Sequence, residues 1–305
     1  MKNRCWILAA LLALLAAGCN DPLPEPEPER EMDPEIVEPD VSLNPRVEGR
    51  HATAYVTYYG SSTPDPGSMT HINYAFAELY VRDGVYQGFK VQGNVSRFEQ
   101  IAALKSKDPQ LKICLSFTHT VSNSDNKQDG GFSAMCKSVS GRKAFAEDCL
   151  AFLERYHLDG VDLDWEFPGL SWSGAACDPS CDTDNYVLLV KQLRETLGST
   201  YTISYAGYCT GKVSVTGGYR YVDIKGMDPY VDYVNIMAYD LDEAPHHHSA
   251  LNDTRAYKDC NQAVNAYLQA GIAPGKLVLS SRFDRGFTGH EHYADLKIIN
   301  MNGRL

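Results

Sequence analysis

The sequence lacks three features, and each absence argues against a class of protein. It has no excess of positive charge, because 28 Lys and Arg residues stand against 39 Asp and Glu residues, and such a chain is poorly suited to bind nucleic acid. It has no glycine-rich phosphate loop at the start of a helix, which argues against a nucleotide-binding fold. Its apolar segment at residues 6–17 is shorter than the roughly 20 residues that a membrane-spanning helix needs.

The N-terminus has the composition of an export signal. Lys2 and Arg4 precede the apolar segment and Cys19 follows it, which is the order of a cleaved signal peptide. The ending is similar to a bacterial lipobox, although Ala16 stands where that motif usually has leucine. We therefore expect residues 1–18 to be removed as a lipoprotein signal peptide and Cys19 to be lipidated. The alternative is an ordinary secretory signal with an incidental cysteine.

Residues 19–46 predict a tether. They contain seven prolines and nine Asp or Glu residues, and a proline-rich, self-repelling chain stays extended and cannot build a core. With a lipid on Cys19, this segment predicts a protein that is exported and anchored to a bacterial membrane, at the outer membrane or the cell surface. The folded domain is expected at residues 47–305, as a monomer.

The cysteines of that domain number seven, so at least one has no partner within the chain. Cys114 and Cys149 lie in apolar, periodic contexts and are expected to be buried thiols. Export permits disulfides, so Cys177 and Cys181 could form a local loop disulfide. A metal site at this pair would need further ligands.

From residue 47 the chain alternates short β-rich segments with segments of helical spacing. Ser96 and Ser140 are expected to cap helices, and further helices are expected at residues 183–197 and 253–270. This alternation predicts a parallel sheet with right-handed crossovers, and a (β/α)8 TIM barrel is the leading arrangement. A doubly wound open sheet is the alternative. The expected strands are residues 55–59, 71–77, 112–117, 160–165, 201–206, 231–238 and 277–281.

The number of expected strands is one short of a complete barrel. Seven candidates are found, and the sequence ends soon after the seventh. We expect either an eighth strand that the residues do not reveal or a barrel that is incomplete at its C-terminus because the chain is truncated.

The most informative segment is LDGVDLDWEFPG at residues 158–169. Because side chains alternate along a strand, Asp162, Asp164 and Glu166 are expected on one face. Adjacent buried carboxylates must share protons or find partners, and their repulsion raises the proton affinity of one of them. Pro168 predicts the end of the strand, which places Glu166 where barrel enzymes carry out catalysis. The alternative is an exposed strand with charges on its solvated face.

The complete pattern D-x-x-D-x-D-x-E at residues 159–166, with Trp165 and a following FPG, matches the signature of glycoside hydrolase family 18 and resembles its chitinase branch. Other segments resemble strands of the same family in the same order. These segments are residues 58–60, residues 72–77 with Phe76, the Met237-Ala-Tyr-Asp240 motif, and residues 277–280 followed by Phe283. The resemblance covers residues 52–298.

The resemblance implies hydrolysis of β-1,4-linked N-acetylglucosamine glycans by a retaining, substrate-assisted mechanism. Glu166 would protonate the departing oxygen and then activate water. Asp164 would orient the acetamido group of the sugar, with Asp162 behind it sharing a proton. Tyr239 would hydrogen-bond the acetamido oxygen.

The resemblance also implies a substrate-binding role for Tyr58, Phe76, Ser116, Met237 and Asp240. Among these, Tyr58 and Ser116 would support the aspartate pair, and Asp240 would support distortion of the sugar ring. Neither a cofactor nor a metal is implied. The run of histidines at residues 246–248 is interpreted as a solvated or sugar-contacting loop, with a metal site as the alternative.

Three departures from the family pattern affect substrate preference. Thr118 and His119 replace two glycines after the third strand, and Arg282 and Asp284 replace Pro and Tyr after the seventh. None of the three tryptophans is placed to form the aromatic floor that the family's eighth strand supplies. Trp165 favours chitinase-like action. The alternatives are an endo-β-N-acetylglucosaminidase acting on the chitobiose core of N-glycans, and a catalytically weak glycan-binding protein.

Overall fold

The computed structural model of the chain describes residues 51–119, 131–170, 176–208, 222–241, 248–252 and 259–280, with the backbone of 296–299. The predicted signal peptide, the tether and Cys19 lie outside these residues, as do His246, His247 and Phe283. Within the described residues, no helix combines the length and apolar character needed to cross a membrane.

Seven parallel strands form the wall of a barrel, as the sequence predicted. Along the wall, β1 pairs with β2, β2 with β4, and the pairing continues in chain order to β8. The strands are β1 (Ala52–Thr57), β2 (His71–Arg82), β4 (Lys112–Thr118), β5 (Gly160–Asp164), β6 (Thr202–Gly207), β7 (Tyr233–Met237) and β8 (Leu277–Ser280). The predicted (β/α)8-type fold is therefore confirmed, and the alternative of a doubly wound open sheet is wrong.

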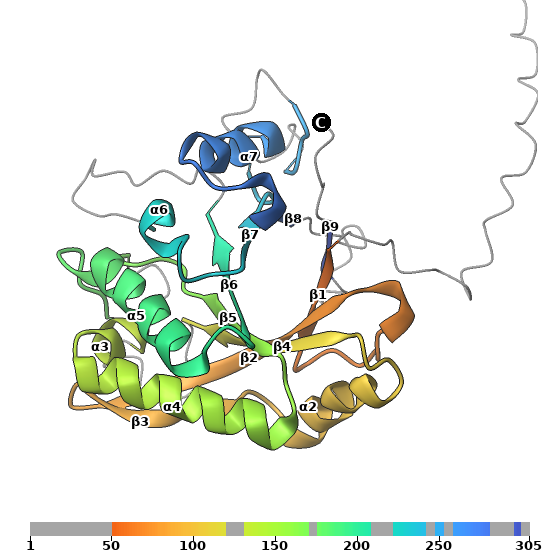
Figure 1. Ribbon diagram of the computed structural model, residues 1–305, viewed down its shortest axis with the longest axis horizontal. Helices are drawn as coiled ribbons and strands as arrows, with labels where there is room; N and C mark the ends of the chain where they lie inside the picture. The colour runs from red at the N-terminus through yellow and green to blue at the C-terminus, as the bar shows by residue number, and fades with distance from the viewer. Residues whose placement is uncertain are drawn as a thin grey trace, which may run out of the picture. The chain divides into compact units, whose positions relative to one another are not determined.

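Two further strands lie outside the seven segments that were expected as strands. Strand β3 (Val85–Val91) forms an antiparallel hairpin with β2, and β9 (Leu296–Ile299) lies between β8 and β1, antiparallel to both. The eighth place in the wall is thus occupied by a short antiparallel strand, whereas a complete (β/α)8 barrel would have a parallel strand there. Figure 1 shows β9 beside β1.

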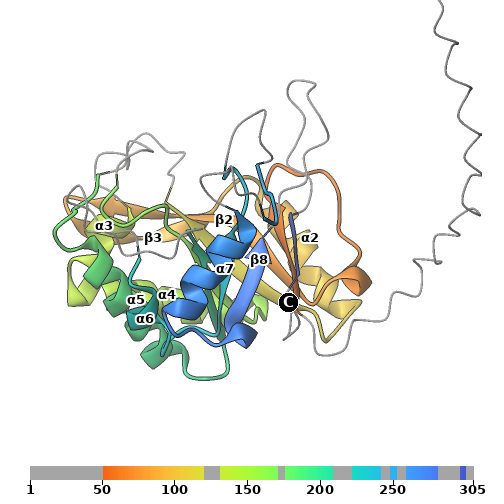
Figure 2. The ribbon, with the colours of Figure 1, turned by 90° about the horizontal axis from the view of Figure 1, so that it is seen from above.

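The helices cover the outer face of the barrel. In Figure 1, α4 and α5 lie side by side against the sheet, and in Figure 2 the β2–β3 hairpin extends beside α3. The helices are α2 (Val95–Ala102), α3 (Phe132–Cys136), α4 (Val139–Tyr156), α5 (Asp182–Leu197), α6 (Ile224–Met227) and α7 (Cys260–Gln269).

The two predicted N-caps lie two residues too late in the sequence. The side chain of Asn94 caps α2 by accepting a hydrogen bond from the backbone N–H of Ser96. The side chain of Ser138 caps α4 by accepting one from Gly141. Asn and Ser are both favoured caps because their side-chain oxygen satisfies a free N–H of the first turn. The segments before α2 and α4 each contain more than one such residue, so the first residue of each helix could not be fixed from the sequence.

The strands are polar toward the barrel interior and apolar toward the helices. On β5, Val161 and Leu163 are fully buried in the apolar core, together with Tyr186 and Leu189 of α5. The alternate residues Asp162 and Asp164 face the interior, as the period of two along a strand requires. Other strands contribute buried polar side chains, namely Thr53, Asn73, Ser116, Ser204, Asn235 and Ser280.

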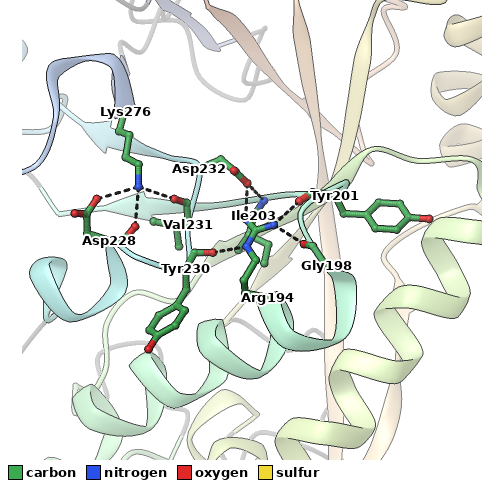
Figure 3. A network of polar contacts seen from close by, with 9 residues as sticks. All are labelled: Arg194, Gly198, Tyr201, Ile203, Asp228, Tyr230, Val231, Asp232 and Lys276. Atoms are coloured by element: carbon green, nitrogen blue, oxygen red, sulfur yellow. Dashed lines mark hydrogen bonds and ion pairs between the residues drawn. The ribbon is translucent and has the colours of Figure 1, made fainter.

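An ion-pair network joins the N-terminal ends of β6, β7 and β8 (Figure 3). The Arg194 guanidinium of α5 donates to the carbonyls of Gly198, Tyr201 and Tyr230 and to the carboxylate of Asp232 at 2.6 Å. The Lys276 ammonium, just before β8, donates at 3.0 Å to the Asp228 carboxylate. These contacts give hydrogen-bond donors to backbone carbonyls near the strand ends that would otherwise be unpaired.

Asp159 and Asp232 occupy equivalent positions, because each directly precedes a strand. Asp159 precedes β5 and Asp232 precedes β7. The Asp159 carboxylate accepts the backbone N–H of Ile113 at 2.8 Å, and the Asp232 carboxylate accepts that of Ile203 at 2.7 Å. Lys105 and Lys112 also pair with Asp159. Asp159, the first aspartate of the D-x-x-D-x-D-x-E pattern, therefore stabilises the N-terminal end of the barrel.

The six cysteines in the described part of the chain are free thiols. Cys114 and Cys149 are buried, as expected. Cys177 and Cys181 are not joined in a disulfide.

Candidate active site

The candidate catalytic residues gather at the C-terminal end of the barrel strands. Strand β5 ends at Asp164, and Glu166 follows two residues later. Strand β7 ends at Met237, and Tyr239 and Asp240 follow it. Because parallel strands end on the same side of a barrel, these side chains share the face that carries the active sites of (β/α)8 enzymes.

Asp162 is fully buried and accepts four hydrogen bonds from four different strands. Its Oδ2 accepts from the Ser116 hydroxyl of β4 at 2.7 Å and from the Tyr55 hydroxyl of β1 at 2.9 Å. Its Oδ1 accepts from the Ser204 hydroxyl of β6 at 2.5 Å and from the Asn235 amide of β7 at 3.1 Å. Burial raises the pKa of Asp162, and these four donors oppose that rise by stabilising the ionised form.

Asp164 and Glu166 form a second, coupled unit. Burial raises the pKa of Asp164 well above its usual range, and the neighbouring charges of Glu166 and Asp162 raise it further. A side-chain hydrogen bond joins Asp164 to Glu166. This hydrogen bond raises the pKa of Asp164 and lowers that of Glu166, as expected when a protonated Asp164 carboxyl is the donor.

Glu166 has the proton affinity of a general acid that works near neutral pH. Burial raises its pKa to about 7, the hydrogen bond from Asp164 opposes the rise, and the charge of Asp240 adds to it. A catalytic acid is most effective when its pKa lies near the operating pH. Burial thus raises the pKa of all three carboxyl groups of the row, and repulsion from Glu166 and Asp162 adds to the rise at Asp164.

Packing on both sides fixes the segment that carries Glu166. Trp165 stacks on Phe132 of α3, with ring centroids 5.2 Å apart and an interplanar angle of 12°. Beyond Glu166, the backbone N–H of Gly169 donates at 3.1 Å to the buried carboxylate of Asp182, the first residue of α5. The same carboxylate accepts the Ser133 hydroxyl at 2.7 Å. Asp182 was not predicted as a site residue, although an acidic residue in the first turn of a helix is a recognisable signal.

The support expected from Tyr58 is provided by Tyr55 instead. Tyr55 lies within strand β1, and its hydroxyl donates to Asp162 in the barrel interior. Strand β1 ends at Thr57, so Tyr58 lies beyond it. The Tyr58 ring packs edge-on against Tyr59 at 5.0 Å, and its backbone N–H donates to Ala75. Ser116, by contrast, contacts Asp162 as the resemblance implied.

The structure places the other implied binding residues on strands and loops at this end of the barrel. Phe76 lies at an irregularity in the pairing of β2 with β4 and is half-buried. Met237 and Tyr239 are also half-buried. Asp240 is exposed with a φ of 52°, and its charge acts on Glu166.

Two residues that depart from the family pattern lie beside the carboxylate row. Thr118 pairs with Asp164 across β4 and β5 and is buried. The backbone N–H of His119 donates to the Asp164 carbonyl at 3.1 Å, and the imidazole Nδ1 lies 3.3 Å from the same oxygen. Burial lowers the pKa of His119, which favours a neutral ring with its proton on Nδ1.

No described group of three or more His, Cys, Asp and Glu side chains has a geometry that could hold a metal ion. Of the three consecutive histidines, only His248 is described; its Nδ1 lies 3.8 Å from a carboxylate oxygen of Asp240.

The sequence model of the Glycosyl hydrolases family 18 matches residues 51–298. The chain belongs to glycosyl hydrolase family 18. Mouse (Mus musculus) chitotriosidase-1 is 27% identical over 242 residues, which cover 73% of this chain and 49% of that protein. Chitinase A1 of Niallia circulans is 26% identical over 303 residues, covering 77% of this chain and 42% of that protein.

The solved structures give the same family fold. The crystal structure of the chitinase domain of the spore coat protein CotE from Clostridium difficile superposes with a TM-score of 0.63 at 27% identity. The match covers 75% of this chain and 64% of that domain. This family 18 chain therefore spans less than half of the two curated relatives and about two thirds of the solved domain.

Proposed function

We propose that this family 18 chain hydrolyses β-1,4-linked N-acetylglucosamine glycans, in the manner of a chitinase, with retention at the anomeric carbon. The observation that carries the proposal is the hydrogen-bonded pair of Asp164 and Glu166 at the C-terminal end of β5. Its support from relatives is the similarity of this chain to a chitotriosidase and to a chitinase, at 27% and 26% identity.

Glu166 acts as the acid and then as the base. In the first step its proton passes to the glycosidic oxygen, the bond from that oxygen to the anomeric carbon breaks, and the acetamido oxygen of the same sugar forms a new bond there. The product of this step is a cyclic oxazolinium ion. In the second step Glu166 takes a proton from water, and the hydroxyl attacks the anomeric carbon and reopens the ring.

Asp164 positions the acetamido group. One of its carboxyl oxygens, Oδ1, is buried and accepts no hydrogen bond, and buried polar atoms of this kind require a partner. The acetamido N–H of the sugar supplies one. The negative charge of Asp162 beneath this pair offsets the positive charge that develops on the oxazolinium ring. Tyr239, directly after β7, donates to the acetamido oxygen and directs it at the anomeric carbon.

The proposed substrate is a chitin-type oligomer rather than the chitobiose core of an N-glycan. The reason is Trp165, the part of the signature that resembles the chitinase branch of the family. Its ring stacks on Phe132 and packs at a tilted angle of 57° against Tyr186. Hydrolysis of a chromogenic chitobioside and release of glycan from an N-glycoprotein, assayed together, distinguish the two substrates. If glycan is released from the N-glycoprotein faster than the chitobioside is hydrolysed, the chitobiose core of N-glycans is the substrate and the proposal of chitin is wrong.

Replacement of the acid tests the catalytic proposal. Glu166→Gln is expected to lose about 100- to 10,000-fold in kcat, the range that general acid catalysis of this kind contributes. Binding of the oligomer, measured by calorimetry, should remain. Cellotetraose, which has no acetamido group, should not be cleaved by the unsubstituted protein. Undiminished turnover in Glu166→Gln, or cleavage of cellotetraose, contradicts the mechanism.

We also propose that the protein is exported and held at a bacterial membrane by a lipid on Cys19. The support is the sequence alone: the export signal at residues 1–18 and the acidic, proline-rich segment at 19–46. An extended spacer of this kind would hold the monomeric barrel away from the membrane surface, where a polymeric glycan is accessible.

A further inference from the structure

The Asp162 end of the carboxylate row is surrounded by residues from strands far apart in the sequence. Ser116, Asp162 and Ser204 stand in register across β4, β5 and β6, and all three are fully buried. Asn235 reaches the same carboxylate from β7. The resemblance to the family drew attention only to Ser116 among these donors, so the contribution of Ser204 and Asn235 is a separate observation.

The number of donors matches the number of acceptor sites on an ionised carboxylate. Each oxygen of Asp162 accepts two hydrogen bonds, and a carboxylate offers about four lone-pair sites in total. A protonated Asp162 would need one of these partners to accept instead. The amide nitrogen of Asn235 cannot accept, so either a hydroxyl would have to turn out of its donating orientation or the Asn235 amide would have to turn over.

Asn235 also fixes the direction of the hydrogen bond from Tyr55. Its amide nitrogen has two hydrogens, one directed at Asp162 Oδ1 and one at the Tyr55 hydroxyl, 3.0 Å away. Because that hydroxyl accepts from Asn235, its own proton is directed at Asp162 Oδ2. One amide thus supplies one donor to each carboxylate oxygen, directly to one and through Tyr55 to the other.

We infer that Ser204 and Asn235 are positioning residues that hold Asp162 as an anion, so that the mobile proton of the row stays on Asp164 and faces Glu166 before substrate binds. This inference rests on the proposed function, because it assigns a role in preparing the same acid. It differs from the expectation that Asp162 and Asp164 share a proton. Asp164 then needs no rearrangement before it meets the acetamido group.

The inference predicts a shift in the pH dependence of activity. Hydrogen bonds to a carboxylate lower its pKa, so Ser204→Ala should raise the acidic limb of the kcat/KM profile by about one pH unit. Asn235→Ala, which removes one direct donor and releases the Tyr55 hydroxyl, should move that limb at least as far. Ser204→Thr keeps the hydroxyl and should return the limb toward its original position.

Ser280→Ala is the matched control. Ser280 is a buried serine on β8 whose hydroxyl has no hydrogen-bond partner and does not contact Asp162. The same loss of an oxygen atom there should leave both limbs of the profile in place. If Ser204→Ala lowers kcat with an unmoved acidic limb, the residue has only a structural role and the inference is wrong.

A measurement without turnover separates this inference from the proposed function. The complete chain is labelled with 13C at the aspartate carboxyl carbon, and the Asp162 signal is identified by its loss in Asp162→Asn. In the unsubstituted protein that signal should show an anion at pH 6, and in Ser204→Ala it should titrate at a pH about one unit higher. An Asp162 that is protonated at pH 6 overturns the inference. This result does not depend on whether any glycan is cleaved.

Discussion

The backbone N–H of Gly169 donates a 3.1 Å hydrogen bond to the carboxylate of Asp182, so the first residue of α5 holds the chain three residues beyond Glu166. Asp182 is fully buried, and its second oxygen accepts the hydroxyl of Ser133 from α3. A single carboxylate therefore joins two helices to the segment that carries the acid.

Asp182→Asn is expected to weaken this connection, because an amide has only one acceptor oxygen. Its NH2 group would face either the Gly169 N–H or the Ser133 hydroxyl, each of which now donates to a carboxylate oxygen. The free energy of unfolding should fall by about 2 kcal/mol, the typical worth of a buried hydrogen bond to a charged group. In an assay, kcat should fall more than KM rises. Asp184→Asn, an exposed change in the same first turn, is the control and should have a much smaller effect. Equal effects of the two substitutions would show that the Gly169 contact is unimportant.

The elevated pKa of Glu166 predicts a pH-dependent stability. Below pH 4.5 the carboxyl group is neutral in folded and unfolded chains. Between pH 4.5 and about 7 the unfolded chain ionises while the folded chain keeps its proton, so the folded state loses stability as pH rises. Glu166→Gln removes this loss. The melting temperature of the variant should exceed that of the unsubstituted protein at pH 8 and approach it at pH 4. A difference that stays constant with pH would contradict the raised pKa.

Asp159 is expected to affect stability and not chemistry, although it begins the signature pattern. Its carboxylate accepts the backbone N–H of Ile113 at the end of the barrel opposite Glu166. Asp159→Ala should lower the free energy of unfolding by about 1 to 3 kcal/mol and leave kcat within about twofold at temperatures where the protein is folded. Asp232→Ala, which removes the equivalent contact to Ile203, should behave in the same way. A large fall in kcat for Asp159→Ala alone would assign it to the chemistry.

Lipidation can be tested at the cysteine that the signal predicts. Cys19→Ala, expressed in a bacterium supplied with labelled palmitate, should abolish incorporation of the label and move the protein from the membrane to the soluble fraction. Cys5→Ala is the control, because residue 5 lies in the segment expected to be removed. Label retained in Cys19→Ala would favour an ordinary secretory signal.

The sequence allowed much of the barrel to be predicted because periodicity is a local property. All seven parallel strands overlap the short β-rich segments that were expected, although β1 begins three residues earlier, at Ala52. The missed β3 also had a local signal, since Asp83-Gly84 precedes it and both residues have positive φ values of 52° and 73°, as a tight hairpin turn requires. Nothing comparable indicated that β9 would run antiparallel.

The carboxylate row could be found from its spacing, but the donors around it could not. Tyr55 and Tyr58 have similar neighbours in the sequence. Only the pairing of β1 with β2, which ends at Thr57, decides that Tyr55 reaches Asp162. Ser204 and Asn235 are single polar residues in apolar strands, and their shared target becomes apparent only when the strands are placed side by side.

The hydrogen bond between Asn235 and Tyr55 joins residues 180 positions apart. Contacts of such large sequence separation carry the entropic cost of closing a long loop, so we expect them to form late in folding. A chain in which β4, β5 and β6 have assembled but β1 and β7 have not would give Asp162 only its two serine donors. Such an intermediate would bury the carboxylate with half of its partners, which favours protonation or opening of the strand. Assembly of a competent acid is therefore coupled to the final closure of the barrel, and no partly folded form of this chain should carry it.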